Sequence, residues 1–152
     1  MKIHLTLRNE SPCKGVGIYR RDALMHLAER VCQGEGHGGD AELSLLFCSD
    51  RFIQELNKTY RKQNKATDVL SFSQPKGIFH GVPVLGDIVI SLETVERRCE
   101  GSRRAMRNEV NLLFCHGLLH LLGLDHDTPA ARKIMNDKQA LYLFLDPSAA
   151  WH

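Results

Sequence analysis

Residues 115–126 read CHGLLHLLGLDH, and the expected fold of the chain is built around this stretch. His116 and His120 are four residues apart in an apolar run, so a helix of about 3.6 residues per turn places them on the same face. Gly123 follows, and a glycine can adopt the left-handed conformation that ends a helix and reverses the chain. His126 can then approach the first two histidines. The spacing predicts three imidazoles that converge on one metal ion.

The number of ligands indicates what kind of metal site this is. Three protein ligands leave a fourth position for water, which is typical of catalytic zinc sites, whereas structural zinc sites use four protein ligands. Neutral imidazole suits zinc, so we expect one Zn²⁺ ion, with nickel or another divalent metal as an open alternative. The other interpretation, three core histidines on an apolar helix, is disfavoured by the spacing and by Gly123.

The histidine spacing also overlaps that of the metzincin peptidases, in which a glutamate after the first histidine serves as general base. Gly117 occupies that position here, which disfavours a peptidase of that mechanism. Cys115 precedes the first histidine, but adjacent residues of a helix point about 100° apart. We therefore expect Cys115 to face the core and not the metal.

The same stretch resembles the signature of the YbeY family, metal-dependent endoribonucleases of ribosomal RNA maturation. Residues 60–72 resemble the family's second signature, a Tyr-Arg pair, a short polar run and then Thr-Asp-Val-Leu-Ser-Phe. Residues 85–88, Leu-Gly-Asp-Ile, have the family's form and position between the two. The resemblance extends from about residue 40 to 145. Leu118 and Ser73 depart from the residues usual in the family, but neither departure removes a ligand.

This resemblance implies a single-strand-specific, metal-dependent endoribonuclease that acts in ribosomal RNA processing and ribosome quality control. Single-stranded RNA, in particular ribosomal RNA, would be its substrate, and the ribosome or ribosomal proteins would be its partners. The resemblance assigns the metal ligands to His116, His120 and His126, and catalytic roles to His116 and Arg61. A guanidinium can hold two phosphate oxygens at once, so an arginine suits this chemistry. A metzincin-like peptidase without the glutamate and a non-catalytic ribosome-associated module stabilised by zinc remain alternatives.

The composition is that of an ordinary globular protein. The chain has 152 residues, 43% of them hydrophobic and 25% charged, which predicts one domain over residues 1–152. A net charge of +2 gives no general affinity for nucleic acid, so RNA contacts must come from local clusters of charge. The densest basic cluster, our best candidate for a contact with the RNA backbone, consists of Arg97, Arg98, Arg103, Arg104 and Arg107. Lys58, Lys62 and Lys65 are compatible equally with solvation and with RNA contact.

Cysteine usage and hydropathy predict the compartment. An odd number of cysteines, five, with no C-x-x-C pair and no apolar leader does not describe a disulfide framework. The apolar runs are too short to span a bilayer. We therefore expect a soluble cytoplasmic protein with no membrane partner, and the sequence does not predict an oligomeric state.

Hydrophobic periodicity predicts an α+β fold, with a four-stranded mixed sheet packed with helices and a central buried helix that carries the three-His motif. The strands are expected near residues 3–7, 42–48, 69–72 and 85–92. The helices are expected near residues 19–33, 52–60, 92–99, 102–122 and 128–145. The connection over 74–83 is rich in turn residues and is a candidate lid over the cleft.

Several side chains outside the histidine motif have predicted roles. Glu109 lies seven residues before His116, about two helical turns, and is a candidate to accept a hydrogen bond from the ring N–H of His116. Asp87, inside a strand, is expected to be structural, and Asp125 is expected to orient neighbouring groups and not to act as a base. The apolar stripe of the helix near 52–60 is expected at Phe52, Ile53, Leu56 and Tyr60. That of the last helix is expected at Ile134, Met135, Leu141, Tyr142 and Leu145.

Overall fold

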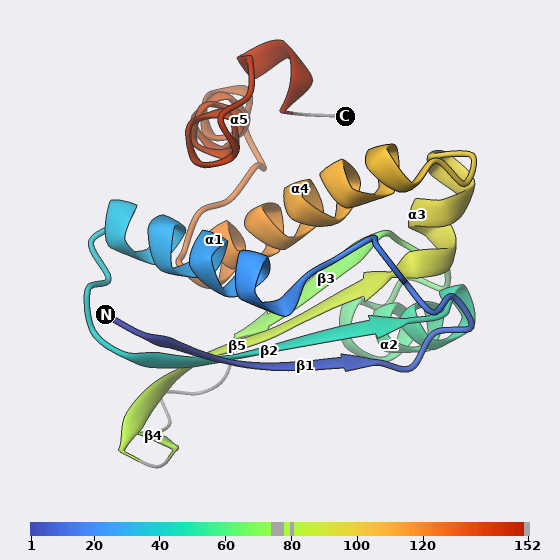
Figure 1. The fold of residues 1–152 in the computed structure, drawn as a ribbon, viewed down its shortest axis with the longest axis horizontal. Helices are drawn as coiled ribbons and strands as arrows, with labels where there is room; N and C mark the ends of the chain where they lie inside the picture. The colour runs from blue at the N-terminus through green and yellow to red at the C-terminus, as the bar shows by residue number, and fades with distance from the viewer. Residues whose placement is uncertain (74–77, 80, 151–152) are drawn as a thin grey trace.

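The computed structural model describes residues 1–73, 78–79 and 81–150, and it has the predicted α+β fold (Figure 1). The N-terminal half contains β1 (Ile3–Asn9), α1 (Arg21–Gly34), β2 (Ala41–Cys48), α2 (Asp50–Arg61), β3 (Val69–Ser73) and β4 (Ile78–Phe79). The C-terminal half contains β5 (Val82–Ser91), α3 (Leu92–Arg98), α4 (Arg103–Leu121), α5 (Pro129–Leu143) and the short 3-10 turn η1 (Pro147–Ala149).

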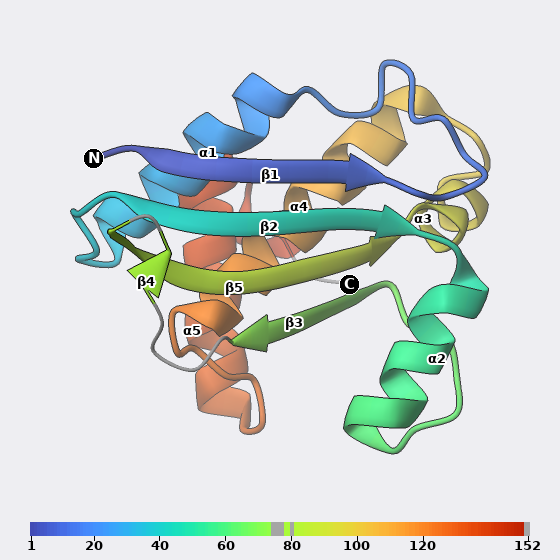
Figure 2. The same ribbon diagram turned by 90° about the horizontal axis from the view of Figure 1, so that it is seen from below.

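Four strands form the main sheet in the order β1-β2-β5-β3. The first three are parallel and β3 is antiparallel to β5, so the predicted mixed sheet is confirmed and β3 is an edge strand (Figure 2). The short strand β4 lies off this path and pairs with the start of β5. This pairing explains why β5 begins at Val82, earlier than predicted. Residues 74–77 and 80 of the suggested lid lie outside the described residues, and part of the rest of the segment forms β4 and the start of β5.

Helices pack on both faces of the sheet. Figure 2 shows α1, α4 and α5 on one side, where alternate residues of β2 such as Leu43, Leu45 and Phe47 enter the main core. On the other face, Ile53 of α2 packs with Cys48, Leu70 and Val89 of the sheet. None of the helices in the described ranges is long and apolar enough to cross a lipid bilayer.

The central buried helix is α4, as predicted. Its fully buried side chains include Val110, Leu113, Phe114, Cys115, Leu118 and Leu119. Gly117 lets this helix lie close to the sheet, because a Cβ atom there would be 2.9 Å from Ser71 Oγ and 3.0 Å from Ile88 Cγ2. Ser71 Oγ also donates a hydrogen bond of 3.1 Å to the Gly117 carbonyl. Rigid packing against β3 and β5 therefore holds the histidine-bearing part of α4.

The predicted apolar stripe of α2 is partly wrong. Phe52 and Tyr60 are 43% and 65% exposed, whereas Ile53 and Asn57 are buried. The loop after α2 folds back along the helix, and Asn57 Nδ2 donates to the Lys65 carbonyl at 3.0 Å. Burial of this amide costs little because it is hydrogen-bonded.

The apolar stripe predicted for α5 is also partly wrong. Ile134 and Leu141 are 54% and 65% exposed, while Met135, Gln139 and Tyr142 are buried. Gln139 thus takes a position in the stripe that hydrophobic periodicity assigns to an apolar residue. Its partners, described below, explain why an amide is stable there.

Candidate metal centre and its cleft

The end of α4 brings the three histidines together. The helix stops at Leu121, and Gly123 adopts the left-handed region with a φ of 103°. The Gly123 N–H donates to the His120 carbonyl and the Leu124 N–H to the Leu119 carbonyl, both at 3.0 Å. This pair of bonds is the Schellman motif, which reverses the chain after a helix. The reversal predicted at Gly123 is therefore confirmed, and it carries the following residues back toward the helix.

The three imidazoles converge as predicted. His116, His120 and His126 each offer one ring nitrogen to the site, and these three nitrogens lie within 4.8 Å of one another. The Nε2 atoms of His116 and His120 are 3.1 Å apart. A tetrahedral zinc ion with Zn–N bonds of about 2.0–2.1 Å separates its ligand nitrogens by about 3.3 Å. The donor set and its spacing thus fit a single divalent metal ion.

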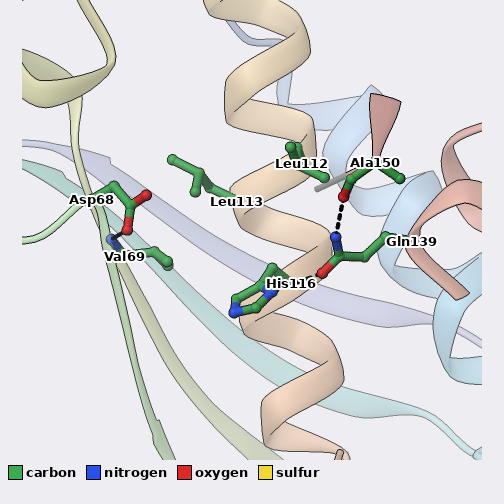
Figure 3. A pocket seen from close by; sticks show the side chains of 7 residues that line it. All are labelled: Asp68, Val69, Leu112, Leu113, His116, Gln139 and Ala150. Atoms are coloured by element: carbon green, nitrogen blue, oxygen red, sulfur yellow. Dashed lines mark hydrogen bonds between the residues drawn. The ribbon is translucent and has the colours of Figure 1, made fainter. Parts of the chain in front are cut away.

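A glutamine from another helix sets the protonation of His116 (Figure 3). His116 Nδ1 lies 2.7 Å from Gln139 Oε1, and Gln139 Nε2 donates to the Ala150 carbonyl. The second bond settles which end of the amide faces the histidine, so the oxygen accepts and Nδ1 carries the proton. The lone pair of His116 is therefore on Nε2, the atom that faces His120.

The prediction that Glu109 would be the partner of His116 is wrong. Glu109 Oε2 lies 3.6 Å from Arg98 Nη1, and Gln139 occupies the position next to Nδ1. Seven residues only approximately complete two helical turns, so the faces of Glu109 and His116 diverge. One feature of the sequence could have indicated Gln139. This polar residue shares a helical face with the apolar residues Met135 and Tyr142.

Burial favours the neutral form of His116 and His120. The pKa of His116 is lowered to about 4, chiefly by burial and also by the neighbouring His120 and His126, although the hydrogen bond with Gln139 acts to raise it. The pKa of His120 is also lowered, first by burial and then by His126. Neutral imidazoles expose the lone pairs that a metal requires.

Arg61 lies in the same cleft as the three histidines. The cleft has a volume of about 780 Å³, and its walls come from the end of α2, from β3 and from the segment after α4. Arg61 is the last residue of α2, because Lys62 adopts the left-handed region with a φ of 57°. Its Nη2 donates to the Ser71 carbonyl at 2.6 Å. The structure thus brings Arg61 into one cleft with the three predicted metal ligands, His116, His120 and His126.

The predicted basic cluster is largely engaged within the protein. Arg97 Nη1 lies 2.9 Å from Asp50 Oδ2, and Arg98 Nη1 lies 2.9 Å from Asp68 Oδ2. Arg107 donates to the Gly17 carbonyl at 3.0 Å. Ion pairs offset the charge that would attract phosphate, so this cluster is a weaker RNA-binding candidate than its density in the sequence suggested.

The two aspartates with predicted roles lie in different settings. Asp125 Oδ1 accepts a 2.7 Å hydrogen bond from the His126 backbone N–H, and this bond lowers the pKa of Asp125. Such a contact fits the predicted orienting role. Asp87 is half-buried in β5, where it lies opposite Phe72 of β3, and its structural role stays a prediction.

Comparison with known proteins agrees with this geometry. A sequence profile described as endoribonuclease YbeY matches residues 16–144. An endoribonuclease YbeY from Anaeromyxobacter sp. strain Fw109-5 is 50% identical over 103 residues, covering 66% of this chain and 52% of the relative. The chain thus spans about half the length of that relative. The Pelotomaculum thermopropionicum protein of the same name is 42% identical over 120 residues, covering 76% of this chain and 79% of its own.

A further relative and a solved structure cover nearly the whole chain. The endoribonuclease YbeY of Moorella thermoacetica is 36% identical over 146 residues, covering 91% of this chain and 94% of the relative. A solution structure of a Thermotoga maritima protein superposes with a TM-score of 0.56 at 27% identity, covering 93% of this chain and 86% of the other. The profile match, these identities and the shared fold lead to one conclusion: the chain belongs to the YbeY endoribonuclease family.

Proposed function

We propose that this protein is a metal-dependent endoribonuclease that cleaves single-stranded RNA. The observation that carries the proposal is the presence of Arg61 and three converging imidazoles in one cleft, in a chain of an endoribonuclease family. We extend the proposal, from the family resemblance, to ribosomal RNA processing and ribosome quality control in the cytoplasm, with the ribosome or its proteins as partners.

In this proposal His116, His120 and His126 hold one divalent ion, and zinc is the first choice because neutral imidazole suits it. An ion held by three protein ligands supplies Lewis acidity toward a phosphoryl oxygen and lowers the pKa of a coordinated water. The protein contributes ligand geometry. Gln139 holds the proton on Nδ1 of His116, so that Nε2 points its lone pair at the centre of the site.

Arg61 binds the phosphate and stabilises charge. Its exposed guanidinium lines the cleft, and the hydrogen bond to the Ser71 carbonyl limits where its remaining N–H groups point. Donors that are already oriented stabilise the negative charge that grows on phosphoryl oxygens without reorganising during the reaction. Because guanidinium donors are planar and paired, they match phosphate oxygens better than an ammonium group does.

The packing around Gly117 argues against a peptidase. Metzincins place their general base at this position, but here a side chain would collide with Ser71 and Ile88. A glutamate there would require the side chains of Ser71 and Ile88 to move. A phosphodiester, whose charge Arg61 can bind, is therefore the favoured substrate class.

One experiment separates the proposed activity from its alternatives. Zinc-loaded protein and its Arg61→Ala and His120→Ala variants are incubated with single-stranded RNA and with casein. Arg51→Ala serves as control, because Arg51 is an exposed arginine at the start of α2 and is not among the residues that line the cleft. We expect RNA cleavage by the wild type and the control, and strong losses in the other two variants.

The other outcomes overturn the proposal. Cleavage of casein identifies a peptidase. If neither polymer is cleaved, while chelation lowers the melting temperature, the metal is structural and the protein is a non-catalytic module.

A further inference from the structure

An aromatic surface next to the cleft extends the site beyond the metal. Tyr60, Arg61 and Phe72 form it, and we call it the Tyr60 platform. We propose that Tyr60 stacks on an unpaired nucleobase of the RNA next to the phosphate that Arg61 binds. The proposal rests on the proposed function for the identity of the ligand, and it adds the part of the molecule that selects single strands.

The ring of Tyr60 is both exposed and supported. It lies in the last turn of α2 and is 65% exposed, although hydrophobic periodicity places it on the buried stripe of that helix. Its centroid is 5.4 Å from that of Phe72 in β3, with the two rings at 66° to each other. This edge-to-face contact restricts the tyrosine ring before any ligand arrives. A ring that is already ordered loses less entropy when a base stacks on it.

The platform is continuous with the catalytic cleft. The Arg61 guanidinium lies 5.5 Å from the centroid of the Phe72 ring and donates to the carbonyl of Ser71, the neighbouring residue in β3. Tyr60 and Arg61 therefore contact the same side chain, and Arg61 also lines the cleft that contains the three histidines. Figure 2 shows β3 at the edge of the main sheet, and among the described residues no further strand pairs with its outer side. A strand of RNA whose phosphate sits at Arg61 can place an adjacent base on Tyr60.

The charge around the platform suits a polyanion. Lys58, Lys62 and Lys65 are exposed, and none of them takes part in an ion pair among the described residues. Arg97 and Arg98, in contrast, are paired with Asp50 and Asp68. Three exposed cations outside these ion pairs thus flank Tyr60 in the sequence, in a chain with a net charge of only +2. Cations beside an exposed aromatic ring are the usual elements of single-strand binding.

Stacking on Tyr60 distinguishes single strands from duplexes. In a duplex each base is already stacked and paired, so its face is not available to a side chain. An unpaired base can turn out and cover the tyrosine ring. The metal and Arg61 would contact only groups that all RNA shares. Stacking on Tyr60 requires an unpaired neighbouring base, so the platform favours single strands.

The test measures RNA binding separately from cleavage. The dissociation constant of a fluorescent single-stranded RNA of ten nucleotides is measured by anisotropy in two arms. The first arm uses metal-free protein. The second arm uses zinc-loaded protein with a 2′-O-methylated strand. We expect Tyr60→Ala to weaken binding about tenfold, which is typical of one lost stacking contact. Tyr60→Phe and Tyr60→Trp should bind within about twofold of the wild type, since each keeps an aromatic face.

Phe52→Ala is the matched control. Phe52 is an exposed aromatic residue of the same helix, 43% exposed, in the first turn and so at the far end from Arg61. It should leave the dissociation constant unchanged. A duplex of the same sequence should bind wild type and Tyr60→Ala alike. One abasic position in the single strand should weaken wild-type binding, with no further loss in Tyr60→Ala, because the two changes remove the same contact.

Specific results would overturn the inference. Equal binding of Tyr60→Ala and wild type, an equal loss on duplex RNA, or loss in Tyr60→Phe would each exclude stacking. If Tyr60→Ala keeps RNA affinity but no longer cosediments with ribosomes, the platform contacts a protein. If RNA binding depends on Tyr60 but the wild-type protein cuts no RNA, the result supports the platform and contradicts the proposed nuclease activity. Failure of the inference about Tyr60 is therefore distinguishable from failure of the proposed function.

Discussion

The side chain of Gln139 accepts a hydrogen bond of 2.7 Å from Nδ1 of His116, across 23 residues of sequence. Gln139 is 1% exposed, and its amide nitrogen donates to the Ala150 carbonyl near the C-terminus (Figure 3). A relay of two hydrogen bonds thus connects the end of the described chain through α5 to a metal-ligand candidate on α4. Outer partners of this kind orient ligating histidines and adjust their basicity.

Removal of this partner should weaken metal binding. Gln139→Ala leaves the Nδ1–H of a buried imidazole without its acceptor, so we expect zinc affinity to fall about tenfold to a hundredfold. Gln139→Glu keeps an acceptor for Nδ1 but loses the donor to the Ala150 carbonyl, so it should recover only part of the affinity. Competition with a chromophoric chelator measures both dissociation constants, and unchanged affinity in Gln139→Ala would contradict the role of the relay.

A methyl group at Gly117 should destabilise the fold. Alanine is a better helix former than glycine by about 1 kcal/mol, yet its Cβ would lie 2.9 Å from Ser71 Oγ and 3.0 Å from Ile88 Cγ2. Overpacking typically costs about 1–3 kcal/mol, so we expect Gly117→Ala to lower the free energy of unfolding in urea. Gly38→Ala is the control, since a Cβ there meets no atom within 4 Å. Equal stability of both variants would show that α4 can move away from the sheet.

Substitution of Arg61 should affect turnover more than stability. Its side chain is exposed, so Arg61→Ala should keep the wild-type melting temperature. Loss of a preorganised donor costs about 10²–10³ in kcat in other enzymes, and we expect a loss of this order on single-stranded RNA. Arg61→Lys should recover little, because an ammonium group lacks the paired donors of guanidinium. Wild-type kcat in Arg61→Ala would remove this residue from the mechanism.

Acid should unfold the protein partly through Glu35. Burial acts to raise the pKa of this carboxyl, but hydrogen bonds from Lys138 and Tyr142 outweigh it, so the pKa lies below the ordinary value of 4.5. The ionised form is therefore favoured by folding. Its stabilising effect is present above pH 4.5 and is lost as the pH falls through the lower, folded value.

Glu35→Gln isolates this effect from other groups that titrate in acid. The variant should melt below the wild type at neutral pH, and the difference should shrink as the pH falls below 4.5, where the wild-type carboxyl also becomes neutral. Melting temperatures of both proteins over a pH series provide the measurement. A difference that does not depend on pH would mean that the charge of Glu35 is unimportant.

Local patterns were enough to predict the core of the site. His116, His120 and Gly123 lie within a few residues of one another, so helix periodicity and a single left-handed glycine place them with little help from the rest of the chain. The four strands of the main sheet were also predicted from short local segments, the first of them from alternation of apolar residues. The role of Arg61 came from resemblance to a family, since no local pattern links it to the histidines.

Contacts between distant segments were decided only by the tertiary structure. Gln139 reaches His116 because α5 packs on α4. Arg97 and Arg98 become weaker candidates for RNA contact because Asp50 and Asp68 form ion pairs with them. Hydrophobic periodicity counts every amide as a surface residue, so it cannot show which ones find a partner inside. It also cannot show which aromatic residues stay outside, as Tyr60 does, because exposure depends on what the neighbouring strand and loop leave uncovered.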